Sequence, residues 1–213
     1  MIIDMHMHEM RYSGDSFLRL ENMVEIAKRR GLDGICITDH DSMGLKEFAA
    51  EYSEKTGFPI FVGIEFYSLQ GDIVAFGIED YPKERIPAQE FVDLVQAQGG
   101  MCFSAHPFRN NNRGLEENLK IVKGLDGIEV LNGSTLYEAN RKAAEYAAEL
   151  GLATVGSSDC HVPEKLGLYA TYFPREIRSV QELIRSVKRC ETLPVYYKAV
   201  SYTHLTLPTI CSV

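Results

Sequence analysis

The amino-acid sequence predicts an α/β fold built on a parallel sheet. Short segments rich in apolar and β-branched residues alternate with longer segments that have the apolar spacing of amphipathic helices. These strand–helix units recur roughly every 25–35 residues, and no linker-like or low-complexity stretch divides them. A regular repeat of this kind favours a barrel over a sandwich.

The chain is long enough for one domain with a substantial core. It has 213 residues, of which 45% are hydrophobic and 24% charged, as is typical of globular proteins. We expect a single domain over residues 1–200. The net charge of −8 argues against nonspecific binding to nucleic acid or an acidic membrane, but it allows a nucleotide substrate held by metals.

Targeting signals and cysteine usage indicate the compartment. No apolar run approaches the ~18 residues of a membrane span, and no signal peptide is visible. The five cysteines show no paired CxxC spacing. We therefore expect a reduced, cytoplasmic protein that does not bind membranes.

The elements are assigned from apolar periodicity. Helical apolar spacing marks the segment 20–30, which precedes Gly31, a residue suited to the left-handed conformation of a helix C-cap. Glycines stand in the same place after three further predicted helices: Gly57, Gly99 and Gly151. The predicted helices are 20–30, 45–56, 88–98, 116–123, 136–150 and 180–189. The predicted strands are 2–8, 34–38, 60–65, 72–77, 101–105, 127–131, 153–156 and 168–173.

The last segment, 201–213, differs in composition from what precedes it. It contains no charged residue and shows no helical periodicity. We interpret it as translated vector sequence, and the alternative is a C-terminal strand. We therefore assign no functional role to His204 or Cys211.

The first residues, Asp4-Met-His6-Met-His8, predict a metal site. In a strand, residues two apart point to the same face, so the three polar side chains would project together. Neutral imidazoles bind zinc, iron and manganese-type ions, and a nearby carboxylate such as Asp4 can fix the tautomer of a ligating histidine. The alternative is a pair of exposed histidines near a frayed terminus, or part of a purification tag.

Further potential ligands stand where later predicted strands end. They are His40, Glu65, His106, Asp159 and His161. The carboxyl ends of strands form the active face of barrels and open α/β sheets. Taken singly, each residue could instead serve a turn, an ion pair or a helix cap, as could Asp15. Taken together, so many buried ionisable groups would be very costly without a metal.

The order of these residues resembles the PHP (polymerase and histidinol phosphatase) family. The most specific motifs are Asp4-x-His6-x-His8, Ser13-Gly14-Asp15, Gly31-Leu-Asp33-Gly and Ile37-Thr-Asp39-His40-Asp41. Glu65, His106-Pro107, Gly127-Ile-Glu129-Val-Leu-Asn132 and Gly156-Ser-Ser-Asp159-Cys-His161 continue the series in the family's order. The resemblance covers residues 1–165.

The resemblance implies a distorted (β/α)7 barrel with two to three divalent metal ions at the carboxyl ends of its strands. It implies one ion held by His6, His8, Glu65 and Asp159, and another held by Asp15, His40 and His161. Glu65 would bridge to a middle ion that His106 also binds. Asp4 and Asp39 would orient ligands rather than bind metal. Mixed imidazole and carboxylate ligands suit manganese, iron or zinc better than calcium.

The chain departs from the family pattern at one position. Many members carry a further histidine in the strand after the glutamate, where this chain has Val74. Valine cannot coordinate a metal, so we expect the middle ion to be held most weakly unless Asp72 compensates from the same strand face.

The resemblance also implies a phosphoesterase in which a metal-bound water attacks phosphorus. Arg109 is the predicted phosphate clamp, because a guanidinium makes planar bidentate contacts, and Asn132 could line the substrate pocket. The alternatives are a surface ion pair for Arg109 and a turn for Asn132. Arg113 and Lys165 are weaker candidates for substrate contact.

We predict hydrolysis of a small phosphomonoester or nucleotide. One alternative is a 5′-end exonuclease or cyclic-nucleotide phosphodiesterase that uses the same metals. No basic track interleaved with aromatic residues is visible for a long strand, which makes a nuclease less favoured without excluding it. An alternative of another class is a metal-degenerate structural or regulatory module, against which the near-complete ligand series argues.

Overall fold

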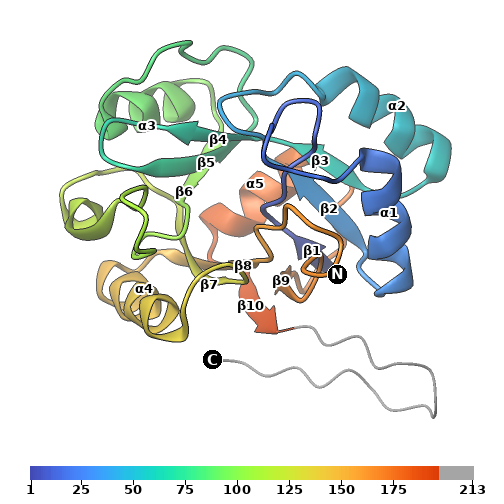
Figure 1. Cartoon of the computed structure of the whole chain (residues 1–213). Coiled ribbons are helices and arrows are strands. Elements are labelled where there is room, and N and C mark those ends of the chain that lie inside the picture. The colour runs from blue at the N-terminus through green and yellow to red at the C-terminus, as the bar shows by residue number, and fades with distance from the viewer. Residues whose placement is uncertain (197–213) are drawn as a thin grey trace.

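The protein is an α/β structure with two five-stranded sheets (Figure 1). The structure, a computed structural model, describes residues 1–196. The first sheet has the order β10 (Leu193–Tyr196), β9 (Tyr169–Tyr172), β1 (Ile2–Asp4), β2 (Gly34–Ile37), β3 (Ile60–Val62). The second has the order β4 (Ile64–Tyr67), β5 (Asp72–Phe76), β6 (Met101–Ser104), β7 (Gly127–Asn132), β8 (Ala153–Ser157).

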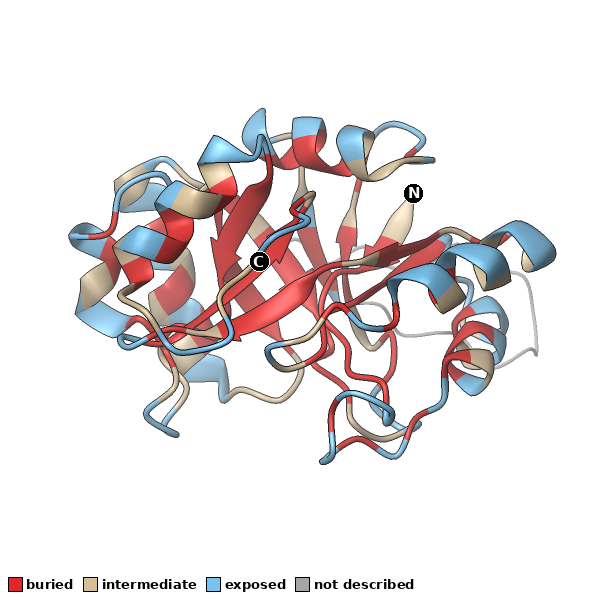
Figure 2. Ribbon diagram, turned by 90° about the horizontal axis from the view of Figure 1, so that it is seen from above, coloured by how far each residue is buried: buried red, intermediate tan, exposed pale blue. Residues whose placement is uncertain are grey.

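The helices cover the outer faces of the two sheets. In the first apolar cluster, α1 (Leu20–Arg29) and α2 (Lys46–Thr56) pack on β2 and β3. In the second, α3 (Ala88–Ala97), the 3₁₀ helix η1 (Glu116–Lys120) and α4 (Tyr137–Leu150) pack on the second sheet. Figure 2 shows buried residues on the strands and exposed residues on the outer sides of these helices.

A third apolar cluster lies between the sheets and draws residues from both. Ile3 and Phe61 come from the first sheet, and Val74, Phe103 and Val155 come from the second. Helix α5 (Val180–Lys188) packs against this interior near the beginning of β1, where the Phe173 backbone N–H donates to the Met1 carbonyl. The opposite end, where β1 finishes, is therefore left for the polar residues of the site.

The expected closed barrel and fully parallel sheet are not what the described residues show. β5 is antiparallel to both β4 and β6, and β9 is antiparallel to β1 and β10. The chain leaves the first sheet and enters the second at Gly63, where a Cβ atom would lie only 2.4 Å from the carbonyl oxygen of Ala75. Within residues 1–196 the α/β fold is confirmed, but the (β/α)7 closure is not.

Isolated bridges join the two sheets at the end where the site lies. Met7 pairs with Cys160, and His40 pairs with Glu65. The strand predicted over 2–8 ends as a regular strand at Asp4, because the following residues pair with loops instead; for example, the Asp159 N–H donates to the His6 carbonyl. The extended backbone after β1 thus places potential ligands beside both junctions between the two sheets.

Other differences from the sequence prediction are local. The segment 116–123 forms only η1, which begins at Glu116 with a φ of 49°, outside the α-helical range, and is followed by Gly124 with a φ of 88°. β10 was not expected; it contains Pro194. None of the described helices is long and apolar enough to cross a membrane. The segment 201–213, including His204 and Cys211, lies outside the described residues.

Candidate metal centre

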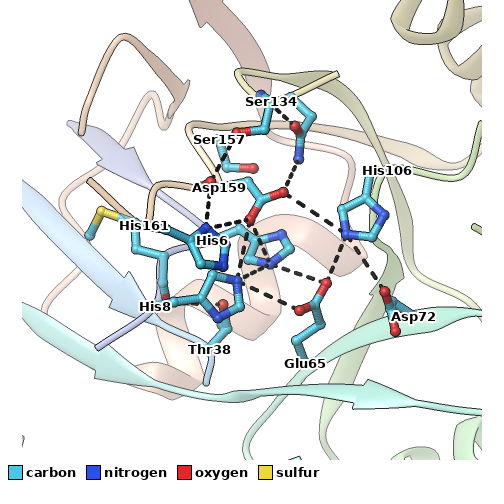
Figure 3. Close-up of polar contacts among 12 residues, drawn as sticks. His6, His8, Thr38, Glu65, Asp72, His106, Ser134, Ser157, Asp159 and His161 are labelled. Carbon is cyan, nitrogen blue, oxygen red and sulfur yellow. Dashed lines mark hydrogen bonds and ion pairs between the residues drawn. The ribbon is translucent and has the colours of Figure 1, made fainter. Parts of the chain in front are cut away.

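Eight side chains from separate parts of the chain converge where β1 ends. Figure 3 shows His6, His8, Glu65, His106, Asp159 and His161 among them. His6 and His8 follow β1, His40 follows β2, Glu65 lies in β4, His106 follows β6, and Asp159 and His161 follow β8. Asp15 reaches the same place from the loop after β1. The structure therefore brings together every residue that the sequence suggested as a metal ligand: His6, His8, Asp15, His40, Glu65, His106, Asp159 and His161.

The first group of donors is buried. His6 Nε2 and His8 Nε2 lie 3.0 Å apart. His6 Nε2 is 3.4 Å from Glu65 Oε1, and His8 Nε2 is 3.3 Å from Asp159 Oδ1. These four side chains are the set expected to hold one ion.

The second group is more open to solvent. Asp15 Oδ2 lies 3.2 Å from His40 Nε2 and 3.4 Å from His161 Nε2. The other ring nitrogen of His40, Nδ1, lies 2.7 Å from Glu65 Oε2. Glu65 thus faces both groups, one oxygen toward each.

A third group adjoins the first. His106 Nε2 lies 2.8 Å from Glu65 Oε1 and 3.8 Å from Asp72 Oδ2. Val74 is paired with Glu65 across the β4–β5 ladder and is fully buried in the apolar interior. Because Asp72 is two residues before Val74 on the same strand, its side chain lies on the same face, nearer the rim.

The hydrogen-bond partners of His6 and His8 show that these donors fit a metal. Glu129 lies 3.1 Å from His6 Nδ1, and a carboxylate can only accept, so the proton sits on Nδ1. Ser13 donates to Asp39, so its oxygen accepts from His8 Nδ1 at 3.3 Å. His6 Nε2 and His8 Nε2 then face each other across 3.0 Å, and with neutral rings both would present a lone pair. Either a proton on His6 or a metal ion between the two nitrogens satisfies this contact, and the geometry fits a metal held by both.

Two further observations agree with metal binding. His40 Nδ1 is buried, and although it lies 2.7 Å from a carboxylate oxygen it makes no hydrogen bond. His106 and Asp159 have positive φ values of 26° and 48°, a strained conformation for residues other than glycine. Strain that brings ligands together is typical of a functional site, and this donor set suggests divalent metal binding.

The charges of the centre are strongly coupled. Burial opposes a charge on His6, but the carboxylates of Glu65 and Asp159 outweigh it and raise the pKa of His6 well above its ordinary value. Burial lowers the pKa of His8 to about 4. Burial also opposes ionisation of Glu65 and Asp159, yet the positive charge of His6 holds the pKa of each carboxyl well below its usual range. A bound cation would take over this balancing role and release protons.

Glu129 is a component of the site that the sequence analysis did not assign. It is completely buried, and its second oxygen accepts from the His106 backbone N–H at 2.6 Å and from Asn132 Nδ2 at 2.9 Å. Ser157 also donates to it. The signal was present in the motif Gly127-Ile-Glu129, where a carboxylate interrupts an apolar strand.

The residues expected to orient ligands have different partners. Asp39 accepts from Ser13 at 2.7 Å and so acts on His8 through that hydroxyl. Asp4 accepts from the backbone N–H groups of Ser158, at 2.9 Å, and Gly167, at 3.0 Å. Asp4 therefore holds the loop that carries Asp159 rather than an imidazole.

Arg109 and Asn132 lie together at the edge of the centre. Arg109 Nη2 donates to Asn132 Oδ1 at 2.7 Å, and Nε donates to Thr135 Oγ1 at 3.0 Å. Arg109 also forms an ion pair with Asp159. A cavity of about 120 Å³ opens here; Arg109, Arg113, His106 and His161 are among the residues that line it. Lys165 contacts Ser134 instead, at 3.2 Å.

Comparison with known proteins finds similarity in sequence and in fold. A family model described as PHP-associated matches residues 137–192, which contain α4, β8, β9 and α5. The uncharacterized protein MJ1587 of Methanocaldococcus jannaschii is 28% identical over 140 residues, which cover 61% of this chain and 80% of that protein. The family-model match thus relates residues 137–192 of the chain to PHP-associated sequences.

Two solved structures show the same fold. One is a two-domain protein of Bacteroides vulgatus containing a predicted PHP-like metal-dependent phosphoesterase, with a TM-score of 0.73 and 23% identity. The other is the lesion-specific endonuclease Q of Pyrococcus furiosus, with a TM-score of 0.69 and 17% identity. They match 92% and 88% of this chain, respectively. The chain spans less than two thirds of either structure, 64% and 56%.

Proposed function

We propose that this PHP protein is a metal-dependent phosphoesterase that hydrolyses a small phosphomonoester or a nucleotide. The observation that carries the proposal is the convergence of eight imidazole and carboxylate side chains, six of which line one small cavity together with Arg109. The set would hold two to three ions of manganese, zinc or iron.

The distances among the donors are compatible with the ligand sets that the family resemblance implies. His6, His8, Glu65 and Asp159 would hold one ion, and Asp15, His40 and His161 would hold a second. Glu65 and His106 would contribute to a third. When bound, such ions lower the pKa of a coordinated water toward ~7 and neutralise charge on phosphoryl oxygens.

The protein's own groups position these ligands and the substrate. Glu129 keeps the proton of His6 on Nδ1 and so leaves Nε2 free to coordinate. Asn132 and Thr135 hold the Arg109 guanidinium in one orientation at the edge of the cavity. From there it can bind a phosphate oxygen and favour the additional negative charge of the transition state. No side chain is assigned as the nucleophile, because water serves in that role.

The alternative enzyme is a nuclease or a cyclic-nucleotide phosphodiesterase on the same centre. The fold is similar to that of endonuclease Q, and one structure of that enzyme contains a 27-mer duplex substrate with an abasic lesion. This similarity supports the nuclease alternative. The small cavity favours a compact phosphoryl group at the metals but does not restrict what the group is attached to. The near-complete donor set argues against a metal-degenerate module.

A substrate panel tests the proposal. Metal-free protein reloaded with manganese is assayed against an aryl phosphate, phosphomonoesters, mononucleotides, cyclic nucleotides and 5′-labelled oligonucleotides. We expect the highest kcat/KM for a phosphomonoester or mononucleotide. Preferential release of nucleotides from the oligonucleotide would establish the nuclease instead. A fully metal-loaded protein with no turnover on any of these would contradict the proposed phosphoesterase.

A further inference from the structure

Arg113 forms a two-point ion pair with a carboxylate of the centre. Its Nε donates to Asp72 Oδ2 at 2.6 Å, and its Nη2 donates to Asp72 Oδ1 at 2.9 Å. Asp72 is almost completely buried, whereas the Arg113 side chain is 31% exposed. Both residues line the same cavity as the metal-binding side chains. The guanidinium is therefore part of the centre and not a surface feature.

The position of Arg113 is fixed by several contacts at once. The Asp72 backbone N–H donates to the Arg113 carbonyl at 2.6 Å. The flanking glycines bring the two segments into backbone contact, since a Cβ on Gly71 would lie 2.6 Å from the carbonyl carbon of Gly114. On its other side the guanidinium lies 4.4 Å from the centre of the Tyr67 ring. These contacts hold the arginine beside Asp72.

Without Arg113, Asp72 would complete a third cation site. Donor atoms of Glu65, Asp72 and His106 lie within 4.8 Å of one another. Beneath them Val74 offers no donor, so the carboxylate of Asp72 is the additional ligand available from this strand. The guanidinium of Arg113 donates to both oxygens of the Asp72 carboxylate. Its positive charge therefore lies next to the donors that Asp72 shares with Glu65 and His106.

We propose that the Arg113 guanidinium occupies the place of a third cation, so that the centre binds two metal ions and one resident arginine. The proposal rests on the proposed metal-binding function and specifies its stoichiometry. A divalent ion at this position would have to displace the guanidinium from Asp72 or remain next to its charge. Arg113 Nη1, which is not used by Asp72, is left for an oxygen of the substrate phosphate.

Metal counting tests this without any assay of turnover. Chelated protein is titrated with manganese to saturation, and bound metal per chain is measured by equilibrium dialysis with elemental analysis. We expect two ions in the wild type and three in Arg113→Met. Arg113→Lys keeps a positive charge and should remain at two. Arg109→Met, which removes the other arginine of the same loop, is the matched control and should also remain at two.

A double variant assigns the additional ion. If Asp72 binds it, Arg113→Met combined with Asp72→Asn should return to two ions per chain. A third ion bound by the wild type at saturation would overturn the proposal, and this result needs no variant to fold. The proposal is equally overturned if Arg113→Met has wild-type circular dichroism and still binds two ions. Since only metal is counted, a protein that binds two ions but hydrolyses no phosphate would refute the proposed function alone.

Discussion

Glu129 Oε1 lies 3.1 Å from His6 Nδ1 inside a fully buried pair. Because Glu129 accepts from Nδ1, Nε2 is the ring nitrogen that faces the other donors of the centre, and its lone pair becomes available when a metal displaces its proton. Burial opposes ionisation of Glu129, but the positive charge of His6 outweighs this and lowers the carboxyl pKa, so the acceptor role persists. Glu129, which lies outside the proposed ligand set, thus determines which ring nitrogen His6, a proposed ligand, presents.

Replacing Glu129 should therefore weaken metal binding. Glu129→Gln keeps the shape but has one acceptor oxygen where the native residue uses two, for His6 and for the His106 backbone. We expect manganese affinity to fall about 10- to 100-fold, as when other outer partners of metal ligands are lost. Calorimetric titration of metal-free protein measures this. Glu79→Gln, on an exposed side chain, is the control. Unchanged affinity in a folded Glu129→Gln protein would contradict the assigned role.

Removing metal should abolish turnover and lower stability. The converging carboxylates lose the cations that offset their repulsion, and in the proposed mechanism the attacking water is activated by metal. Chelation should eliminate aryl phosphate hydrolysis, and manganese, zinc or iron should restore it. Ligand linkage predicts stabilisation of about 2.7 kcal/mol when free metal is 100 times its dissociation constant. Full turnover by protein shown by elemental analysis to be metal-free would contradict this prediction.

The sequence was sufficient to predict which polar residues meet. His6, His8 and His40 stand at or beyond the ends of short apolar segments, and parallel strands bring such ends to one edge. The order of strands and helices was also recoverable, because amphipathic spacing marks a helix such as α1 to within one residue of its end. The positions of these polar residues and the order of the elements can thus be predicted from the local apolar pattern and the direction of the chain.

Other features depend on contacts that no local pattern encodes. The antiparallel direction of β5 is imposed by its neighbours, because an apolar strand has the same composition in either direction. The sequence places Glu129 in a strand, but its role depends on its contacts with His6 and the His106 backbone, which the sequence does not indicate. The Arg113–Asp72 ion pair joins residues 41 positions apart and depends on the close approach of Gly71 and Gly114. The sequence analysis accordingly ranked Arg113 below Arg109.

Gly63 should be required for the step between the two sheets. A Cβ there would lie 2.4 Å from the Ala75 carbonyl oxygen and 2.7 Å from the Phe76 ring, so Gly63→Ala must displace β5. We expect a loss of about 1–3 kcal/mol in the free energy of unfolding, the usual cost of overpacking. Urea denaturation of metal-free protein measures it. Gly14→Ala, where nothing lies within 4 Å of the added Cβ, should change stability little. Equal stability of the two variants would contradict the crowding argument.

The last prediction concerns Arg109 as the phosphate contact. Thr135 and Asn132 orient its guanidinium at the edge of the cavity, so Arg109→Ala should lower kcat/KM by at least ~10-fold, about 1.4 kcal/mol of transition-state binding. Arg109 also pairs with Asp159, a predicted ligand, so metal content must be measured in the same samples. We expect it to remain at the wild-type value, because the ions themselves neutralise Asp159.

Two further variants separate charge from orientation at Arg109. Arg109→Lys keeps a positive charge but cannot form the planar two-point contact, and should recover only part of the lost kcat/KM. Thr135→Val keeps the guanidinium and removes the acceptor that fixes its Nε, so its loss should be smaller than that of Arg109→Ala. If all three variants retain wild-type kcat/KM with full metal content, the side chain does not contact substrate. If the loss instead follows loss of metal, Arg109 supports the ligand Asp159 and the phosphate contact must lie elsewhere.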